Sequence, residues 1–249
     1  MKTNKAKIFG LVGRNISYSF SAGYFAEKFE EEGLDNYYYK NFDIQSIRQL
    51  PEIIANTKGL KGLNVTVPYK QEVIPLLDSL SKKAAVIGAV NTIKITKKGL
   101  KGYNTDHYGF RKALKPLLQP WHNKALILGT GGASKAVAFA LRDMKIEYDF
   151  VSRTATDTVF GYDSLDREIF DDYQIIINTT PLGTYPKVEE CPPLNYRLFT
   201  EKHIAFDLVY NPEETLFLKN AAAGGATAKN GFDMLVHQAD KAWKIWNKS

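Results

Sequence analysis

The sequence predicts an α/β protein of two domains, and three observations lead to this fold class. Short apolar segments typical of strands alternate with segments typical of helices along almost the whole chain of 249 residues. Such alternation is typical of parallel sheets joined by crossover helices. It is interrupted once by a hairpin-like segment and then starts again, which indicates a second domain. With 44% hydrophobic residues, the chain has ample material for buried cores.

The first block is predicted to hold three strands before the interruption. The strands are expected over residues 7–12, 37–42 and 62–67. A helix over residues 21–32 is expected to follow the first strand. Pro68 ends the third strand because proline cannot donate a hydrogen bond within a sheet. Apolar residues then flank Lys97-Lys98-Gly99, which predicts a β-hairpin over residues 93–101.

The second block repeats the pattern with apolar runs suited to buried parallel strands. Its strands are expected over residues 125–128, 148–152, 175–178 and 204–208, with a helix over residues 133–144. The boundary is predicted near residues 104–106. Residues 1–105, completed by the C-terminal helix 231–249, are therefore expected to form one domain, and residues 106–230 the other.

The last helix has a continuous apolar face. This face comprises Phe232, Leu235, Val236, Ala239, Trp243 and Trp246, whose spacing follows the helical period. Met234 and Gln238 fall beside it, one turn apart. We therefore expect the face to pack on a core, with Met234 and Gln238 directed into a cleft.

Charge and composition exclude several classes of partner. The net charge is +6, but lysines and arginines are interleaved with acids and form no basic arm, so no nucleic-acid partner is expected. No apolar run reaches 18 residues and no signal peptide is visible, so no membrane partner is expected. The single cysteine, Cys191, fits a reducing compartment, and we expect cytoplasmic localisation. The four histidines lack metal-ligand spacing, so no metal is expected.

A glycine-rich turn follows the strand predicted at residues 125–128. Gly129 permits a tight turn, and Gly131 and Gly132 let the backbone approach a pyrophosphate closely. The start of the next helix offers free N–H groups to the negative charge. A plain strand–helix turn is the structural alternative. The strand before the turn and the helix after it favour a dinucleotide site.

The strand after this helix indicates which dinucleotide is bound. NAD-binding units usually place an acid at the end of this strand. Asp149, which lies 20 residues after Gly129, stands near the start of the strand instead. The strand ends at Ser152, Arg153 and Thr154, whose guanidinium and hydroxyl groups suit a 2′-phosphate. The sequence therefore predicts NADP.

Four motifs in the first block carry polar groups at unusual density. They are Ser17-Tyr18-Ser19-Phe20-Ser21, Gly62-Leu63-Asn64-Val65-Thr66-Val67-Pro68-Tyr69-Lys70, Gly88-Ala89-Val90-Asn91-Thr92 and Gly102-Tyr103-Asn104-Thr105-Asp106-His107-Tyr108-Gly109. For any one of these serines the structural alternative is a helix cap, and Ser21 is the candidate cap. Strand alternation places Asn64 and Thr66 on one face.

Together these motifs resemble the shikimate dehydrogenase family. The resemblance continues through Gly129–Ser134, Ile177–Gly183, Asp207–Pro212 and Gly231–Gln238, so it covers nearly the whole chain. It implies two α/β domains, an N-terminal substrate-binding domain with a mainly parallel sheet and a Rossmann-like NADP-binding domain, with a cleft between them. It further implies reversible reduction of 3-dehydroshikimate to shikimate in the biosynthesis of chorismate and aromatic amino acids.

The resemblance also implies a role for individual residues. The substrate would contact Ser19, Ser21, Asn64, Thr66, Lys70, Asn91, Asp106, Tyr210 and Gln238. The cofactor would contact Gly129, Gly131, Gly132, Ala133, Ser134, Ser152, Arg153, Thr154, Thr179, Leu208, Gly231 and Met234. A polyhydroxylated anion needs many neutral donors and acceptors, which Ser, Thr, Asn and Gln side chains supply.

Lys70 and Asp106 are the expected catalytic residues. Lys70 is interpreted as the general acid in reduction and the base in oxidation. Asp106 is expected to orient Lys70, and the alternative gives Asp106 the proton transfer itself. A surface lysine following a strand is the structural alternative for Lys70.

The sequence departs from the family pattern in three places, and two rival functions are compatible with it. Ala22 stands where the family commonly has proline, Ser152 replaces an asparagine, and the chain is compact for the family. One rival is a quinate/shikimate dehydrogenase that uses NAD. The other is a non-catalytic module that senses NADP or shikimate, which would be expected to lack Lys70 or Asp106. The oligomeric state is expected to be a monomer or a homodimer.

Overall fold

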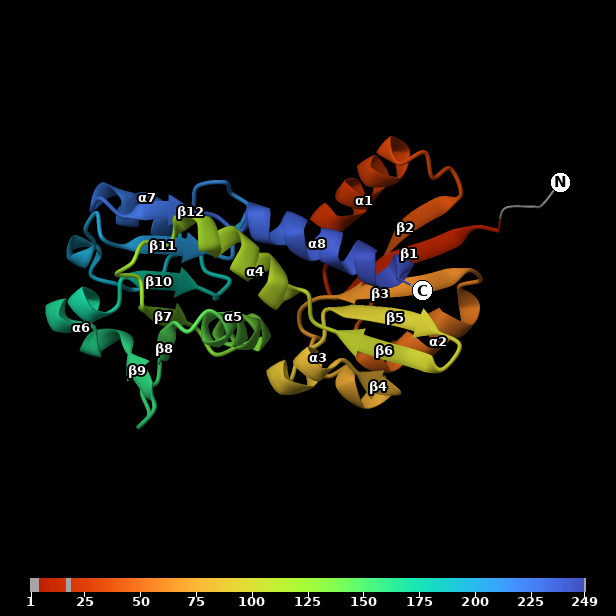
Figure 1. The fold of residues 1–249 in the computed structure, drawn as a ribbon, viewed down its shortest axis with the longest axis horizontal. Coiled ribbons are helices and arrows are strands. Elements are labelled where there is room, and N and C mark those ends of the chain that lie inside the picture. Colours follow the sequence, from red (N-terminus) through yellow and green to blue (C-terminus); the bar gives the residue numbers. More distant parts are fainter. Residues whose placement is uncertain (1–4, 17–18, 249) are drawn as a thin grey trace. The chain divides into compact units, whose positions relative to one another are not determined.

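The computed structural model describes residues 5–16 and 19–248. It divides into two compact units, Met1–Thr105 with Ala239–Ser249, and Asp106–Gln238 (Figure 1). Each unit contains a six-stranded sheet with flanking helices. The predicted two-domain α/β fold is therefore confirmed. Ser17 and Tyr18 of the first polar motif lie outside the described residues.

The first unit has a mixed sheet in the order β2-β1-β3-β5-β6-β4. Its strands are β1 (Lys7–Gly13), β2 (Tyr37–Asp43), β3 (Leu60–Val65), β4 (Ser79–Leu80), β5 (Thr92–Thr96) and β6 (Gly99–Tyr103). β1 pairs in parallel with β2 and β3, and β4 pairs in parallel with β6. The expected hairpin is confirmed, because β5 and β6 pair antiparallel with Thr96 opposite Gly99.

Two apolar clusters cover the two faces of this sheet. The helices are α1 (Phe20–Glu31), α2 (Leu50–Asn56) and α3 (Lys82–Ile87), with short 3-10 turns at Ile47–Gln49 and Ile74–Leu76. α1 and the C-terminal part of α8 (Phe232–Asn247) contribute to a cluster around Phe9, whereas α2 and α3 contribute to a cluster around Leu63. Branched and aromatic side chains from both faces of the strands therefore become buried.

The aromatic cluster around Phe9 anchors the end of the chain. The rings of Phe9 and Trp246 lie 4.8 Å apart between centroids, and Phe25 lies 5.5 Å from Trp246. The indole N–H of Trp246 donates to the carbonyl of Ile93 at 3.0 Å, so its polar atom is satisfied inside the core. On the surface of this cluster, the Tyr24 hydroxyl donates to Asp240 at 2.7 Å.

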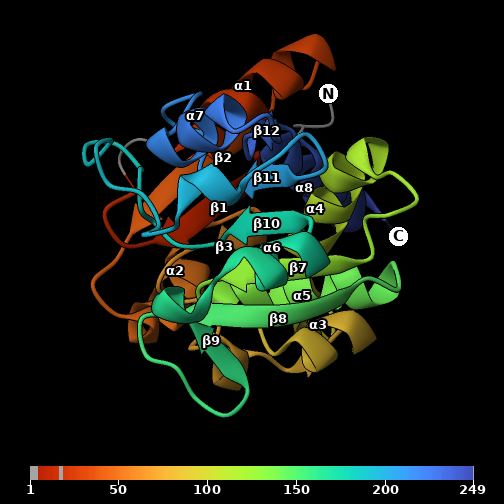
Figure 2. The same ribbon diagram turned by 90° about the vertical axis from the view of Figure 1, so that its left-hand side faces the viewer.

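The second unit has an all-parallel sheet in the order β12-β11-β10-β7-β8-β9. In Figure 2 these strands follow one another from β12 at the top to β9 at the bottom. They are β7 (Lys124–Leu128), β8 (Glu147–Ser152), β9 (Val159–Gly161), β10 (Ile175–Asn178), β11 (Ile204–Asp207) and β12 (Thr227–Lys229). The apolar runs of the central strands β7, β10 and β11 are buried on both sides, as expected of parallel strands between helices.

The helices of this unit contribute to two further cores. They are α4 (Asp106–Leu114), α5 (Gly132–Asp143), α6 (Arg167–Asp172) and α7 (Leu216–Ala223), with 3-10 turns at Lys115–Leu117, Tyr162–Ser164 and Tyr196–Leu198. α4 and α5 pack on one cluster, and α6 and α7 on the other. Along the described part of the chain, every helix is too short or too polar to cross a membrane.

The C-terminal helix differs from its prediction in two respects. Phe232 is 45% exposed rather than buried, whereas Met234 is 8% exposed and packs against the α4–α5 cluster. Residues 231–238 fall in the second unit, although we expected the whole helix in the first. The reason is that α8 begins in one unit and ends in the other, so no single stripe packs on one core. The second half follows the expectation, with Ala239 and Trp246 buried.

Candidate functional site

The strand order of each sheet defines one position where a ligand site is favoured. In open parallel sheets, ligands bind beyond the carboxyl ends of strands, where the connections leave in opposite directions. In the first unit, β1 lies between β2 and β3, so this position is at Gly13 and Val65. In the second unit, β7 lies between β8 and β10, so it is at Leu128 and Asn178. The predicted substrate motifs follow the first position, and the glycine-rich turn follows the second.

The segment after β3 is held in place by a buried tyrosine. Tyr69 is fully buried, and its hydroxyl donates to the Ile44 carbonyl at 2.7 Å. The backbone N–H of Tyr69 donates to Thr66 at 2.9 Å. Lys70 follows directly, and its carbonyl accepts from the N–H of Val90 at 2.7 Å. The backbone of Lys70 is therefore tied to the segment that carries Asn91, while its side chain is half-buried.

Asn64 and Asn91 form the centre of a buried hydrogen-bond network. The amide nitrogen of Asn64 donates to the Asn91 carbonyl and to the Thr92 hydroxyl, both at 3.2 Å. The Asn91 side chain accepts from the backbone N–H of Thr105 at 2.7 Å and donates to its hydroxyl at 2.9 Å. All four side chains are at least 95% buried. The network therefore orients the predicted substrate residues Asn64 and Asn91 and fixes the end of the segment that leads to Asp106.

The serine pair lies at the start of α1. Ser19 is the N-cap, and its hydroxyl accepts from the N–H of Ser21 at 3.2 Å. The cap is therefore Ser19 and not Ser21, because the helix begins at Phe20, one residue earlier than expected. Ser21 is buried inside the first turn of the helix and lies beside the phenol of Tyr39.

Three further residues are predicted to bind the substrate, and they lie on three different elements. Asp106 is the first residue of α4 and is buried. Tyr210 is half-buried in the loop after β11, and Gln238 is buried in α8. The Gln238 amide donates to the Leu235 carbonyl at 3.0 Å.

The glycine-rich turn has the geometry of an anion cradle. Gly129 has φ of +102°, a conformation that L side chains rarely adopt. Gly131 is the N-cap of α5, no side chain caps the helix there, and a Cβ at Gly131 would enter open space. The Ser134 hydroxyl donates to the Gly131 carbonyl at 2.7 Å, which holds the turn. The partly exposed start of α5, with Gly132 and Ala133 after the exposed Gly131, therefore offers N–H groups and space for a phosphate.

A cavity of about 440 Å³ adjoins this turn. Its lining comprises Gly129, Thr130, Ser152, Arg153, Thr154, Tyr162, Thr180, Pro181, Leu182 and Pro193. β8 ends at Ser152, as predicted, so Arg153 and Thr154 stand at the carboxyl end of the strand. Burial raises the pKa of the Tyr162 phenol, and the nearby Arg153 guanidinium opposes that rise. The cavity therefore combines a cation, hydroxyl groups and a ring, which suits the phosphorylated end of a dinucleotide.

Asp149 takes no part in this cavity. It is the third residue of β8, and its carboxylate accepts from the Tyr173 hydroxyl at 2.6 Å. The acid that simple counting would place on a ribose instead holds a neighbouring segment of the protein. The carboxyl end of β8 is left without an acid, as the sequence predicts.

Buried polar groups tie the carboxyl ends of the central strands together. The Thr179 hydroxyl donates to the Leu128 carbonyl at 2.7 Å, directly before Gly129. The Asn178 amide donates to Asp207 at 2.9 Å. Leu208 and Gly231 lie beside these ends, and a Cβ at Gly231 would lie 2.2 Å from the Leu208 carbonyl oxygen. Only glycine therefore allows this close approach of the two segments.

The sequence analysis assigned no role to three residues that organise these sites. Tyr39 contacts Asn64, Tyr162 lines the cavity, and Asp207 ties β11 to β10. Tyr39 and Tyr162 lie outside the polar motifs and carry no local sequence signal. Asp207 stands in the Asp207–Pro212 motif, where its position after a run of buried apolar residues was the available signal.

Asp207 generates a prediction about pH and stability. Burial raises the pKa of Asp207 to about 6 from its usual 3.8, although Thr215, Val209 and Asn178 donate to it. The folded state thus binds this proton more tightly than the unfolded state. Its contribution to stability is present below about pH 4 and is lost as pH rises towards 6, by about 3 kcal/mol in all.

We expect the free energy of unfolding of the wild type, minus that of Asp207→Asn, to fall by about 2 kcal/mol between pH 4 and pH 7, since part of the total effect lies below pH 4. Urea unfolding followed by circular dichroism at both pH values measures this difference. His203, whose pKa burial lowers, acts in the opposite sense in both proteins and cancels. A difference that is independent of pH would show that Asp207 has an ordinary pKa.

Comparison with known proteins identifies similar chains over nearly the whole length. A family model described as shikimate dehydrogenase substrate binding domain matches residues 11–93. The chain is similar to a shikimate dehydrogenase (NADP(+)) of Methanosphaera stadtmanae, with 36% identity over 265 residues that cover 99% of this chain and 93% of that protein.

Solved structures agree with this similarity. A crystal structure of a shikimate dehydrogenase in complex with NADP⁺ has 36% identity and a TM-score of 0.86, covering 97% of this chain and 90% of that one. The shikimate 5-dehydrogenase of Thermus thermophilus in complex with NADP(H) and shikimate has 33% identity and a TM-score of 0.85, covering 97% of this chain and 93% of that one.

Proposed function

The chain belongs to the shikimate dehydrogenase family, and from this premise we propose which of its residues carry the reaction. It is an NADP-dependent oxidoreductase that interconverts shikimate and 3-dehydroshikimate in aromatic biosynthesis. One observation supports the residue assignment above the others. The dipeptide Val90-Asn91 is hydrogen-bonded to the backbone of Lys70 and to Thr105, the residue before Asp106.

The substrate-binding residues supply groups that match a hydroxylated carboxylate. Ser19 and Ser21 hold the carboxylate, since hydroxyls beside the free N–H groups of a helix start stabilise an anion. Asn64, Thr66, Asn91, Asp106, Tyr210 and Gln238 surround the ring hydroxyls. Burial of Asn64 and Asn91 within a complete network supports this role, because orientation of the amides is then independent of the ligand.

Lys70 and Asp106 manage the proton of the reaction. When bound, NADPH supplies the hydride for the C3 ketone. The Lys70 ammonium donates a proton to the developing alkoxide oxygen and takes it back in the oxidative direction. Asp106 holds the ammonium and accepts from a substrate hydroxyl. Consecutive Cα atoms lie about 3.8 Å apart, so the hydrogen bonds that hold Thr105 also limit the position of the Asp106 Cα atom.

The second unit supplies the NADP contacts. The free start of α5, comprising Gly131, Gly132, Ala133 and Ser134 after Gly129, holds the pyrophosphate. Arg153, with Ser152 and Thr154, holds the 2′-phosphate, and this favours NADP over NAD. Thr179, Leu208, Gly231 and Met234 lie along the remainder of the dinucleotide. The open space at Gly131 and the cavity at Arg153 support this assignment.

The rival functions differ in what they require of these residues. A non-catalytic sensor needs neither Lys70 nor Asp106, whereas this chain has both. A quinate dehydrogenase using NAD needs no cation at the end of β8, where Arg153 stands. The cytoplasmic localisation and the monomeric or homodimeric state stay predictions.

The substrate and cofactor are tested by one assay. Purified protein is offered shikimate or quinate with NADP⁺ or NAD⁺, and absorbance at 340 nm is followed. We expect the highest kcat/KM with shikimate and NADP⁺. Activity confined to quinate and NAD⁺ would overturn both choices.

Lys70→Ala tests the proton-transfer role. We expect kcat to fall by at least about 10²-fold with a smaller change in KM, because general acid–base help is worth about 10²–10⁴-fold. Lys82→Ala, at an exposed lysine that starts α3, is the control and should retain wild-type kcat. Near-native kcat in Lys70→Ala would remove Lys70 from this role.

Arg153→Gln tests the phosphate contact. We expect KM for NADP⁺ to rise about 10- to 100-fold, since charge-assisted hydrogen bonds contribute about 1.5–3 kcal/mol. KM for NAD⁺ should change less than about twofold, because NAD⁺ lacks the phosphate. Arg48→Gln, at an exposed arginine of the first unit, is the control. Equal increases for both cofactors would show that Arg153 does not read the 2′-phosphate.

A further inference from the structure

We infer that Asp207 is a positioning residue for Tyr210, because its buried carboxylate ties together the two ends of the loop that carries this tyrosine. The loop comprises residues 208–214, directly after β11. The inference rests on the proposed function, in which Tyr210 contacts the substrate. Asp207 itself touches neither substrate nor cofactor in this scheme, and it acts through the place at which it holds the loop.

The two oxygens of the Asp207 carboxylate accept from opposite ends of this loop. Oδ1 accepts from the backbone N–H of Val209 at 3.0 Å, at the beginning of the loop. Oδ2 accepts from the hydroxyl of Thr215 at 2.6 Å, directly after its end. Asp207 and Thr215 are both fully buried. A single side chain therefore closes the loop through two hydrogen bonds that are shielded from water.

The elements on both sides of the closing bond are themselves fixed. A carboxylate can only accept, so the Thr215 hydroxyl gives its single proton to Asp207. The Thr215 oxygen remains an acceptor, and as the N-cap of α7 it receives the N–H of Leu218 at 3.4 Å. The Asn178 amide at the end of β10 donates to Oδ1 of Asp207 at 2.9 Å. The loop is thus closed between a strand end and a helix start.

The backbone on either side of Tyr210 is also held. The Val209 carbonyl accepts from the N–H of Gly231 at 3.0 Å, and the Asn211 carbonyl accepts from the N–H of Tyr185 at 3.1 Å. Tyr210 is half-buried, whereas Asn211 beside it is exposed. Since the loop belongs to no helix or strand, the position of Tyr210 depends on these bonds and on the closure by Asp207.

Closure of the loop lowers the entropic cost of binding. Residues of an open loop sample many backbone conformations, and only some of these would place Tyr210 against a ligand. When a ligand binds one conformation only, its apparent dissociation constant rises as the population of that conformation falls. Release of one end of the loop should therefore weaken the binding of shikimate.

The predicted cofactor contact in the same loop is held separately. The N–H of Leu208 donates to the Asn178 carbonyl at 3.0 Å, next to the end of β11. This bond does not involve Thr215. Loss of the bond between Thr215 and Asp207 should therefore affect the binding of shikimate more than the binding of NADP⁺.

Thr215→Val is the direct test, with Thr215→Ser as the conservative variant. Valine fills nearly the same space but cannot donate to Asp207, whereas serine keeps the hydroxyl. We expect Thr215→Val to raise KM for shikimate about 3- to 10-fold, with KM for NADP⁺ within about twofold. Thr215→Ser should stay within about twofold of the wild type in both values. A wild-type KM for shikimate in Thr215→Val would overturn the inference, and so would an equal rise in both KM values.

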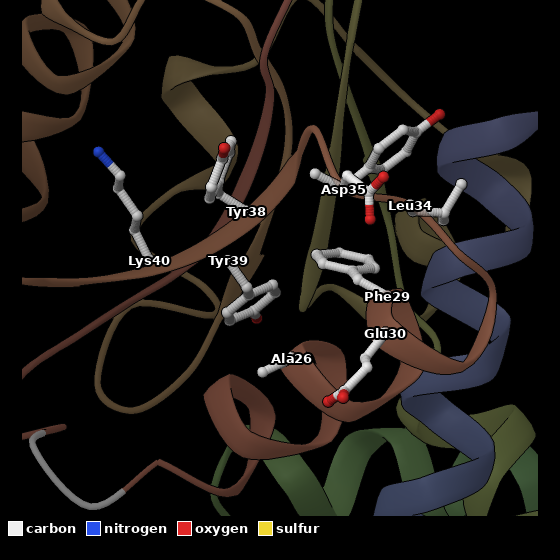
Figure 3. Close-up of a pocket in the computed structure, with 9 residues that line it drawn as sticks. Ala26, Phe29, Glu30, Leu34, Asp35, Tyr38, Tyr39 and Lys40 are labelled. Atoms are coloured by element: carbon white, nitrogen blue, oxygen red, sulfur yellow. The ribbon is translucent and has the colours of Figure 1, made fainter.

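Two controls separate this effect from the ordinary loss of a cap or a hydroxyl. Asp166→Ala removes the N-cap of α6 in the same unit, where Asp166 accepts from the N–H of Ile169 at 3.0 Å. Tyr38→Phe removes a hydroxyl from the first unit, where Tyr38 is 50% exposed and lines a cavity of about 450 Å³ between α1 and β2 (Figure 3). Figure 3 shows Tyr38 and Tyr39 on opposite sides of the β2 ribbon, so this variant leaves the bond from Tyr39 to Asn64 in place.

Both control variants should keep the wild-type KM for shikimate. A rise in Asp166→Ala as large as that in Thr215→Val would show that loss of a helix cap is sufficient, and this would overturn the inference.

A double-mutant cycle tests whether the closure acts through Tyr210. Thr215→Val is made in the wild type and in Tyr210→Ala, and kcat/KM for shikimate is measured. In the wild type we expect a fall of about 3- to 10-fold. In Tyr210→Ala the same substitution should change kcat/KM by less than about twofold, because the side chain that the loop positions is gone. The same fall in both backgrounds would show that Asp207 does not act through Tyr210.

The two proposals fail in different ways. A wild type without shikimate activity contradicts the proposed function, and wild-type kcat/KM in Tyr210→Ala contradicts its substrate contact. An active wild type with an impaired Tyr210→Ala variant and an unaltered Thr215→Val variant contradicts only the role of Asp207. If Thr215→Val does not fold by circular dichroism, Thr215→Ala, which also lacks the hydroxyl, takes its place in each comparison.

Discussion

The cost of burying an amide or carboxylate without hydrogen-bond partners shapes both units of this protein. Each unit places a buried asparagine near the carboxyl end of a strand, Asn64 on β3 and Asn178 on β10. An unpaired buried polar group costs about 1–3 kcal/mol. Each asparagine is therefore paired with neighbouring segments, Asn64 with Asn91 and Asn178 with Asp207. These bonds join loops that meet where the strand order favours a ligand.

The same constraint explains why a site for a hydroxylated anion can be rigid before a ligand arrives. Neutral side chains with several donors and acceptors can satisfy the protein and still offer one group to a ligand. Asn91 illustrates this, since its oxygen and nitrogen both contact Thr105 while its backbone carbonyl accepts from Asn64. The proposed phosphate site uses a different solution. No side chain caps the start of α5 at Gly131, which is exposed, and Arg153 contributes charge at the surface.

Several features were predictable because they depend on neighbouring residues. The alternation of strands and helices, the hairpin at Lys97-Lys98-Gly99 and the glycine turn all follow local patterns. The absence of an acid at the end of β8 was also predictable, since counting along the strand places Asp149 at its beginning. The buried face of α8 was predicted wrongly for Phe232, because a helical period reports a face and not which core each turn meets.

The sequence by itself determined the fold class, the order of the motifs and the residue types available for binding an anion and a dinucleotide. These properties follow from backbone conformation and side-chain chemistry, which are local. Only the tertiary structure decided that Ser19 rather than Ser21 caps α1, that Tyr39 stands against Asn64, and that Asp207 is buried enough for its pKa to rise. The Ser19 cap is a bond to Ser21, two positions away, and depends on where the helix begins. The other two features depend on atoms from segments distant in sequence, and their distances and burial exist only once the chain is packed.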